Sequence, residues 1–288
     1  MLWLPLSLFS AFAQATADAA TKKALRGSDV FMVAWLRNLM AVPFLAAILL
    51  FVPVPRLDAT FYWACGLALP LEVVATILYT KAIEVSPLSL TMPFLALTPF
   101  YLLLTSFLLL GETPSPVGAA GVCLMGAGAY LLNVHTMKDG GILAPFRAVY
   151  REKGSMMMMA VAAIYAITSD LGKLAIMHSS PVFFGASYVA AFSLFFTPVA
   201  LMFTRRPVTL PKGEAGTYIL IGGSLAALTV SQTLALSMAQ VSYMIAVKRT
   251  SLLFSIGYGY FIFREVNIKE RLLGGAVMLA GLALMSAG

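Results

Sequence analysis

Apolar segments of about 20 residues follow one another along almost the whole chain, separated by short polar or proline-containing breaks. A helix rises about 1.5 Å per residue, so a segment of this length crosses the roughly 30 Å hydrocarbon core of a bilayer. The first segment is interpreted as a spanning helix, not a signal peptide, because no basic region precedes it. We therefore predict an all-α membrane protein with ten transmembrane helices, at roughly 2–20, 30–51, 60–80, 87–110, 116–133, 155–176, 182–203, 215–237, 242–263 and 271–287.

Composition supports lipid as the main solvent of this chain. Of 288 residues, 60% are hydrophobic and 11% charged, whereas a soluble domain has about 25% charged residues. The net charge of +7 does not indicate a nucleic-acid partner, because the basic residues flank the apolar segments. Cys65 and Cys123 lie in apolar stretches and are interpreted as small buried hydrophobes. The sequence holds no Walker-type phosphate loop and no metal-ligand spacing, so we expect no cofactor and no metal.

The chain divides into two halves that resemble each other. We predict a first five-helix repeat at 1–135, a linker at 136–154 and a second five-helix repeat at 155–288. Because each half has five helices, the two copies must have opposite orientations, an architecture common among secondary transporters. The matching positions lie at offsets of 153 and 156 residues: Leu110-Gly111-Glu112 with Phe263-Arg264-Glu265, Gly121 with Gly274, and Val85-Ser86 with Val241-Ser242.

Two five-helix repeats, each with a Gly-Glu or Arg-Glu pair after its fourth helix and a glycine-rich fifth helix, resemble the drug/metabolite transporter superfamily. The resemblance is greatest to its EamA-like branch and covers nearly the whole chain. It implies transport of small metabolites, often export, without an ATPase site or a cofactor. A membrane enzyme is disfavoured because the sequence offers no nucleophile–base or metal constellation.

Basic residues are distributed unequally between the two predicted faces. The loops after helices one, three, five, seven and nine hold fourteen Lys and Arg residues, and the opposite face holds two, Arg56 and Lys173. The positive-inside rule then places both termini outside the cytoplasm. The resemblance implies the opposite orientation, with both termini inside. We expect the orientation that the charge count indicates, with both termini outside.

Lys248 and Arg249 are adjacent cations inside the ninth apolar segment. Adjacent side chains on a helix point about 100° apart, so both cannot easily reach the same interface. One interpretation is structural, in which one cation pairs with a carboxylate. The other is a site where an ammonium and a guanidinium bind a phosphate or carboxylate. The pair also resembles the Lys-Arg of the same helix in the triose-phosphate and nucleotide-sugar branches, which there meets substrate phosphate.

Ionisable residues within apolar helices are costly and therefore mark sites of interest. Glu72 lies midway along the third segment and is either the partner of Arg37 or Lys248, or a carboxylate for proton coupling. Arg37 must face the bundle interior. Further candidates for the lining of a substrate cavity are Tyr79, Tyr165, Gln232 and Tyr243.

Two aspartates precede a lysine at helical spacing. Asp18 is followed by Lys22 and Asp170 by Lys173, which places each pair on one helix face. We expect ion pairs within the helix at both places, with substrate binding or coupling as the alternative.

The sequence therefore favours a secondary transporter of a small anionic metabolite in the inner cell membrane, with alternating access between the repeats and with proton coupling as an option. Rival hypotheses are an exporter of amino acids or other zwitterions, a flippase for a lipid-linked anion, and a non-transporting membrane subunit. The glycine-rich segments at 116–133 and 271–287 are typical of close helix packing, either within a monomer or across a homodimer.

Overall fold

The computed structural model describes residues 2–24, 29–86, 92–134, 153–204, 215–261 and 272–287. This part of the chain is all helical and holds no β-strand, which confirms the predicted all-α class. The elements are α1 (Trp3–Ala24), α2 (Val30–Leu49), α3 (Ala59–Val85), the 3₁₀ helix η1 (Met92–Leu97), α5 (Thr98–Leu110), α6 (Pro116–Val134), α8 (Lys153–Met177), α9 (Pro181–Phe203), α10 (Ala215–Met238), α11 (Val241–Lys248), α12 (Ser251–Phe261) and α13 (Leu272–Ala287).

Two of the predicted helices are interrupted. The segment predicted at 87–110 contains η1 followed by α5, and Pro99 at the start of α5 has no amide N–H to donate. The segment predicted at 242–263 is divided into α11 and α12. Between them the backbone tightens, because the amide of Arg249 donates to the carbonyl of Ala246 at 3.0 Å and that of Thr250 to Val247 at 2.9 Å. Bonds to the third preceding residue are those of a 3₁₀ turn, which often marks a hinge when it lies inside a helix.

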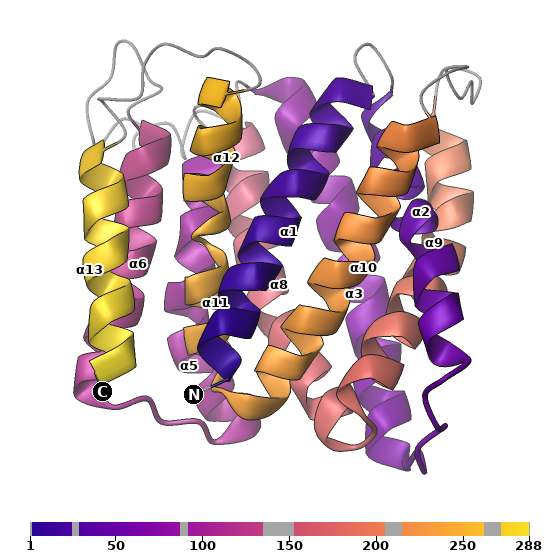
Figure 1. Cartoon of the computed structure of the whole chain (residues 1–288), viewed down its shortest axis with the longest axis horizontal. Helices are drawn as coiled ribbons and strands as arrows, with labels where there is room; N and C mark the ends of the chain where they lie inside the picture. Colours follow the sequence, from indigo (N-terminus) through magenta and orange to yellow (C-terminus); the bar gives the residue numbers. More distant parts are fainter. Residues whose placement is uncertain are drawn as a thin grey trace.

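The helices pack in pairs that join the two halves of the chain. α3 packs along α8, and α1 packs along α10 (Figure 1). At one edge of the bundle α6 faces α13, and at the other α2 contacts α9 and α10. Each half of the chain therefore contributes one helix to every one of these pairs.

Large apolar side chains cover the outside of the bundle. Leu108 on α5, Leu194 on α9 and Met202 on α9 are 68%, 72% and 81% exposed. Small residues fill the space between the helices instead, as on α1, where Ala11 and Ala15 are fully buried. Five of the described helices are long and apolar enough to cross a membrane, and three more apolar helices are shorter. An apolar outer surface with a small-residue interior is typical of a multi-pass membrane bundle.

The glycine-rich helices pack on each other within the chain. A Cβ at Gly121 of α6 would lie 2.8 Å from the carbonyl oxygen of Gly281 on α13, and one at Gly128 would lie 2.7 Å from that of Gly274. Only glycine allows this approach of two backbones. These faces are therefore occupied inside one chain.

Asp58 connects two turns on the face of the bundle where the described ends Trp3 and Ala287 also lie (Figure 1). Its carboxylate accepts a hydrogen bond from the Phe61 amide at 3.0 Å and so caps α3, and it contacts His178 Nδ1 at 2.6 Å. These two bonds, with the Phe61 amide contributing most, lower the pKa of Asp58 below its usual range. We call this side of the bundle the terminal face and the other the loop face.

Candidate functional site

Lys248 lies near the middle of the bundle, at the end of the eight-residue α11. Helix α11 starts at Val241 on the terminal face, so Lys248, seven residues further on, lies about 10 Å into the bundle at about 1.5 Å per residue. The Lys248 Nζ donates a hydrogen bond to Gln232 Oε1 of α10 at 2.6 Å. A neutral amide, and not a carboxylate, is therefore its direct partner.

Arg249 occupies the 3₁₀ turn that follows. Its Nε is buried without a hydrogen-bond partner. Its guanidinium interacts electrostatically with two tyrosines, Tyr79 on α3 and Tyr165 on α8. Within the described residues neither Arg249 nor Lys248 forms an ion pair. The structural interpretation, in which one of the two cations pairs with a carboxylate, is therefore not realised in the described part of the chain.

Glu72 lies midway along α3 and faces the same region. Its carboxylate interacts with the Thr168 hydroxyl of α8 and with the charge of Lys248. Of the two partners predicted for it, Lys248 is therefore within electrostatic range. Arg37 is not its partner.

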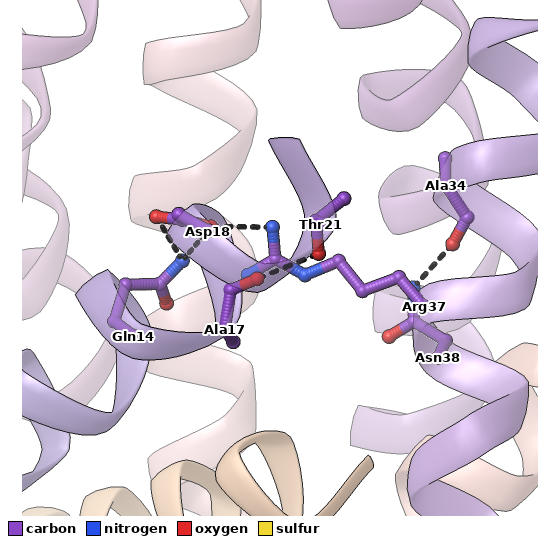
Figure 2. Close-up of polar contacts among 7 residues, drawn as sticks. All are labelled: Gln14, Ala17, Asp18, Thr21, Ala34, Arg37 and Asn38. Carbon is purple, nitrogen blue, oxygen red and sulfur yellow. Dashed lines mark hydrogen bonds and ion pairs between the residues drawn. The ribbon is translucent and has the colours of Figure 1, made fainter. Parts of the chain in front are cut away.

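Arg37 binds Asp18 instead. Its guanidinium extends from α2 to α1, where Nη1 lies 2.5 Å from Asp18 Oδ1 (Figure 2). The Gln14 amide donates to both oxygens of the same carboxylate from the other side, at 3.3 and 3.2 Å. The Asp18 side chain is 41% exposed although it lies within α1. The side chain of Lys22, the predicted partner of Asp18, lies outside the described residues.

These groups form one electrostatic unit, which we call the central polar cluster: Asp18, Arg37, Glu72, Tyr79, Tyr165, Gln232, Lys248 and Arg249. The charges that act on Lys248 come from Arg249, Arg37, Asp18 and Glu72. Tyr79 interacts with Asp18, Arg37 and Arg249. The cluster thus contains three cations and two carboxylates, contributed by α1, α2, α3 and the end of α11, and such an excess of positive charge favours an anion.

Seven of the eight residues predicted to bind substrate or to line its cavity are brought together in this cluster, and the eighth is not. Tyr243 lies nearer the terminal face, packed against Trp3 with ring centroids 6.3 Å apart and against Gly118, where a Cβ would overlap its hydroxyl. The set of predicted residues also lacks two that the structure adds: Thr168, and Tyr188 of α9, which interacts electrostatically with Glu72. Thr168 and Tyr188 were not selected from the sequence, because a neutral hydroxyl in an apolar helix is much less costly than a charge, and helix packing decides which hydroxyls face the cluster.

A second group of polar residues lies nearer the terminal face. Lys173 Nζ of α8 binds Glu112 Oε1 at 2.5 Å and the carbonyl oxygen of Ala239 at 2.5 Å. The other oxygen of Glu112 accepts the amide of Val241, the first residue of α11, at 2.8 Å. This arrangement, which we call the terminal latch, joins the end of α5, α8 and the α10–α11 turn.

The predicted ion pair between Asp170 and Lys173 is not formed. Asp170 is completely buried and accepts a hydrogen bond from Ser106 Oγ of α5 at 2.6 Å. Lys173 binds Glu112 instead, because α5 packs against α8 and brings this carboxylate close to the lysine. The carbonyl oxygen of Ala239, which follows α10, accepts a second hydrogen bond from the same ammonium. Spacing along one helix does not report these tertiary partners.

The apolar helices of the described chain are those of a multi-pass membrane protein. Residues 1–134 match the family model of the EamA-like transporter family, a family of the drug/metabolite transporter superfamily, which confirms the predicted resemblance. A solved crystal structure has the same fold, with a TM-score of 0.77 and 15% sequence identity over 99% of this chain and 97% of that chain. The search of curated proteins gave no match.

Proposed function

We propose that this chain is a secondary transporter of a small anionic metabolite in the inner cell membrane. Ten transmembrane helices would form two inverted five-helix repeats, and the substrate would bind between them in the central polar cluster. The helix pairs support this arrangement, because α3 with α8 has its counterpart in α10 with α1. The fourth and ninth helices are both interrupted by 3₁₀ geometry, and discontinuous helices commonly form substrate sites near the bilayer midplane.

One observation carries the anionic substrate: Lys248 and Arg249 lie in the bundle interior without an ion pair to any described carboxylate. An uncompensated cation at bilayer depth is costly, and a bound phosphate or carboxylate would supply the missing negative charge. The guanidinium fork of Arg249 suits two oxygens of one anion, and the ammonium of Lys248 suits a third.

The purified protein provides a direct test. We expect its melting temperature to rise with phosphorylated or carboxylate metabolites more than with amino acids or lipid phosphates, because binding to the folded state stabilises it. Lys248→Met and Arg249→Lys should each weaken that binding by roughly ten- to a hundredfold, since a charge-assisted hydrogen bond contributes about 1.5–3 kcal/mol. Lys81→Met is the matched control, because this lysine contacts the Phe203 ring and takes no part in the cluster. Unchanged affinity in both cluster variants would contradict the proposal.

A zwitterionic substrate is the second candidate, and Glu72 is the observation that favours it. Its carboxylate lies within electrostatic range of Lys248, so the cluster presents both signs of charge. An amino acid could then place its carboxylate on the cations and its ammonium on Glu72. A melting temperature raised by amino acids alone would select this candidate, and a response confined to lipid phosphates would select a flippase.

A further inference from the structure

Asp170 differs from Asp18, Glu112 and Asp58, which each contact a basic side chain. It is completely buried, its Oδ2 has no hydrogen-bond partner, and its Oδ1 accepts only the Ser106 hydroxyl, itself 2% exposed. Asp18 binds Arg37, Glu112 binds Lys173, and Asp58 binds His178. An ionised carboxylate at this depth without a cation would be costly, whereas a proton would neutralise it.

The cation nearest to Asp170 along the chain is already occupied. Lys173 follows Asp170 by three residues, which places both on one face of α8. Its ammonium is held in the terminal latch by Glu112 and by the carbonyl oxygen of Ala239. Two carboxylates thus lie within electrostatic range of one lysine, and in this conformation the lysine contacts Glu112.

The surroundings of Asp170 contain no other charge that could replace Lys173. Its electrostatic partners among the described residues are Glu112, from the α5–α6 turn, and Lys173 of its own helix, with the hydroxyls of Thr105 and Ser106 from α5. The charged groups of other neighbouring elements are directed elsewhere. Glu72 of α3 interacts with Thr168 and Lys248, Lys248 of α11 binds Gln232, and His178 at the end of α8 binds Asp58.

We propose that Asp170 is a proton-binding site that controls the terminal latch. With the proton on Asp170, Lys173 bonds Glu112 and Ala239 and holds α5, α8 and the α10–α11 turn together. When the O–H bond of Asp170 breaks and the proton leaves to water on the terminal face, the new carboxylate attracts the Lys173 ammonium away from Glu112. Glu112 keeps the Val241 amide and becomes hydrated, and the Lys173 contacts that join α8 to the end of α5 and to the α10–α11 turn are released.

This proton site is separate from Glu72, which lies in the central polar cluster. The proposal assigns the proton as a ligand to Asp170, a carboxylate outside the central polar cluster. It deepens the proposed function and rests on it in one respect, the assumption that the terminal face opens and closes during transport.

A cysteine introduced at Ala235 would report whether the terminal latch is closed or open. Ala235 of α10 is completely buried in the apolar cluster that contains Ala175 and Ile176 of α8. We would place Ala235→Cys in the full chain with Cys65→Ser and Cys123→Ser, reconstitute it in nanodiscs, and measure its labelling by a charged methanethiosulfonate between pH 5 and 8. The reactivity of a thiol itself rises with pH, and this effect must be removed from the measured rates. Each labelling rate is therefore divided by the rate of the same protein with Glu112→Gln, in which the latch lacks the carboxylate that binds Lys173.

We expect this ratio to rise about tenfold per pH unit below its midpoint, because one proton is released on opening. Asp170→Asn should keep the ratio low at every pH, Asp170→Glu should retain the rise, and the control Asp58→Asn should leave it unchanged. A flat ratio in the parent or in Asp170→Glu, or an unchanged rise in Asp170→Asn, overturns the proposal. No substrate is present in this experiment, so its failure leaves the anion-binding test standing, and failure of anion binding leaves the latch standing.

Discussion

Lys248 and Arg249 are neighbours in sequence whose side chains have different surroundings. Lys248 donates to the Gln232 amide, whereas the Nε of Arg249 has no hydrogen-bond partner. Insertion scales assign about 2.5–3.5 kcal/mol to a charged side chain at bilayer depth, and one hydrogen bond to a neutral group contributes only about 0.5–1.5 kcal/mol. The two cations therefore cost stability in the absence of a bound anion, which is the usual signature of a functional group.

Replacing Lys248 tests this reasoning directly. We expect Lys248→Met to express and to run as a monodisperse peak in fluorescence-detected size-exclusion chromatography, because no described carboxylate loses an ion-pair partner. Its unliganded melting temperature should be equal to or above that of the parent. Poor expression that is rescued by Glu72→Leu would show the opposite, that Lys248 and Glu72 form a structural pair.

Glu72 allows a second prediction at this scale. If its carboxylate carries the coupling proton, Glu72→Gln should abolish uptake driven by a pH gradient and leave exchange of substrate across proteoliposomes largely intact. The ligand identified by the melting-temperature test is the one to follow, with Asp58→Asn as a control carboxylate on the terminal face. Undiminished gradient-driven uptake would remove Glu72 from the coupling step.

The sequence was informative about which polar residues to examine and less so about their partners. Charged residues within apolar segments stand out, so Lys248, Arg249, Glu72 and Arg37 were all predicted. Their contacts depend on which helices meet, and for Asp170 the helical spacing predicted the wrong partner. The fully buried Ser106 that binds Asp170 looks in the sequence like any small residue of a membrane helix.

At the scale of the elements, the interrupted helices are the feature with functional consequences. Helix positions follow from runs of apolar residues and from turn residues between them, and the observed ends lie within a few residues of the predicted ones. The division of the ninth helix at Arg249 and Thr250 was not predicted, because a change from four-residue to three-residue hydrogen bonds leaves the apolar pattern unchanged. The turn at Arg249 and Thr250 nevertheless places Lys248 and Arg249, two of the three cations of the central polar cluster, where the helix can bend.

The contact between α6 and α13 gives a prediction about stability. We expect Gly121→Ala to destabilise the protein by about 1–3 kcal/mol, as overpacking typically does, because the new methyl group would meet the Gly281 carbonyl and the Met285 backbone amide at 2.8 and 2.9 Å. Gly66→Ala on α3 is the matched control, since no atom lies within 4 Å of its Cβ position. Melting temperatures in the same detergent measure both, and equal values would mean that α6 and α13 separate easily.

At the scale of the whole molecule, the two faces of the bundle differ in kind. The described ends of α1, α3, α6, α9 and α12 all lie on the loop face, while Trp3 and Ala287 lie on the terminal face (Figure 1). The segments that follow those five helices are the ones that hold most of the basic residues in the sequence. The described helix ends that flank these basic segments share one face, which is the face that the positive-inside rule would assign to the cytoplasm.

Orientation in the membrane is the prediction that follows. A single cysteine placed within 134–154 should be protected from impermeant thiol reagents in intact cells, because fourteen Lys and Arg residues belong to that face and two to the other. A cysteine added after Gly288 should be labelled, since the described end of α13 lies on the terminal face. Both are made with Cys65→Ser and Cys123→Ser, and permeabilised cells provide the control that each cysteine is reactive. The reverse pattern would place the termini in the cytoplasm, and the proton released from Asp170 would then enter the cytoplasm instead of leaving the cell.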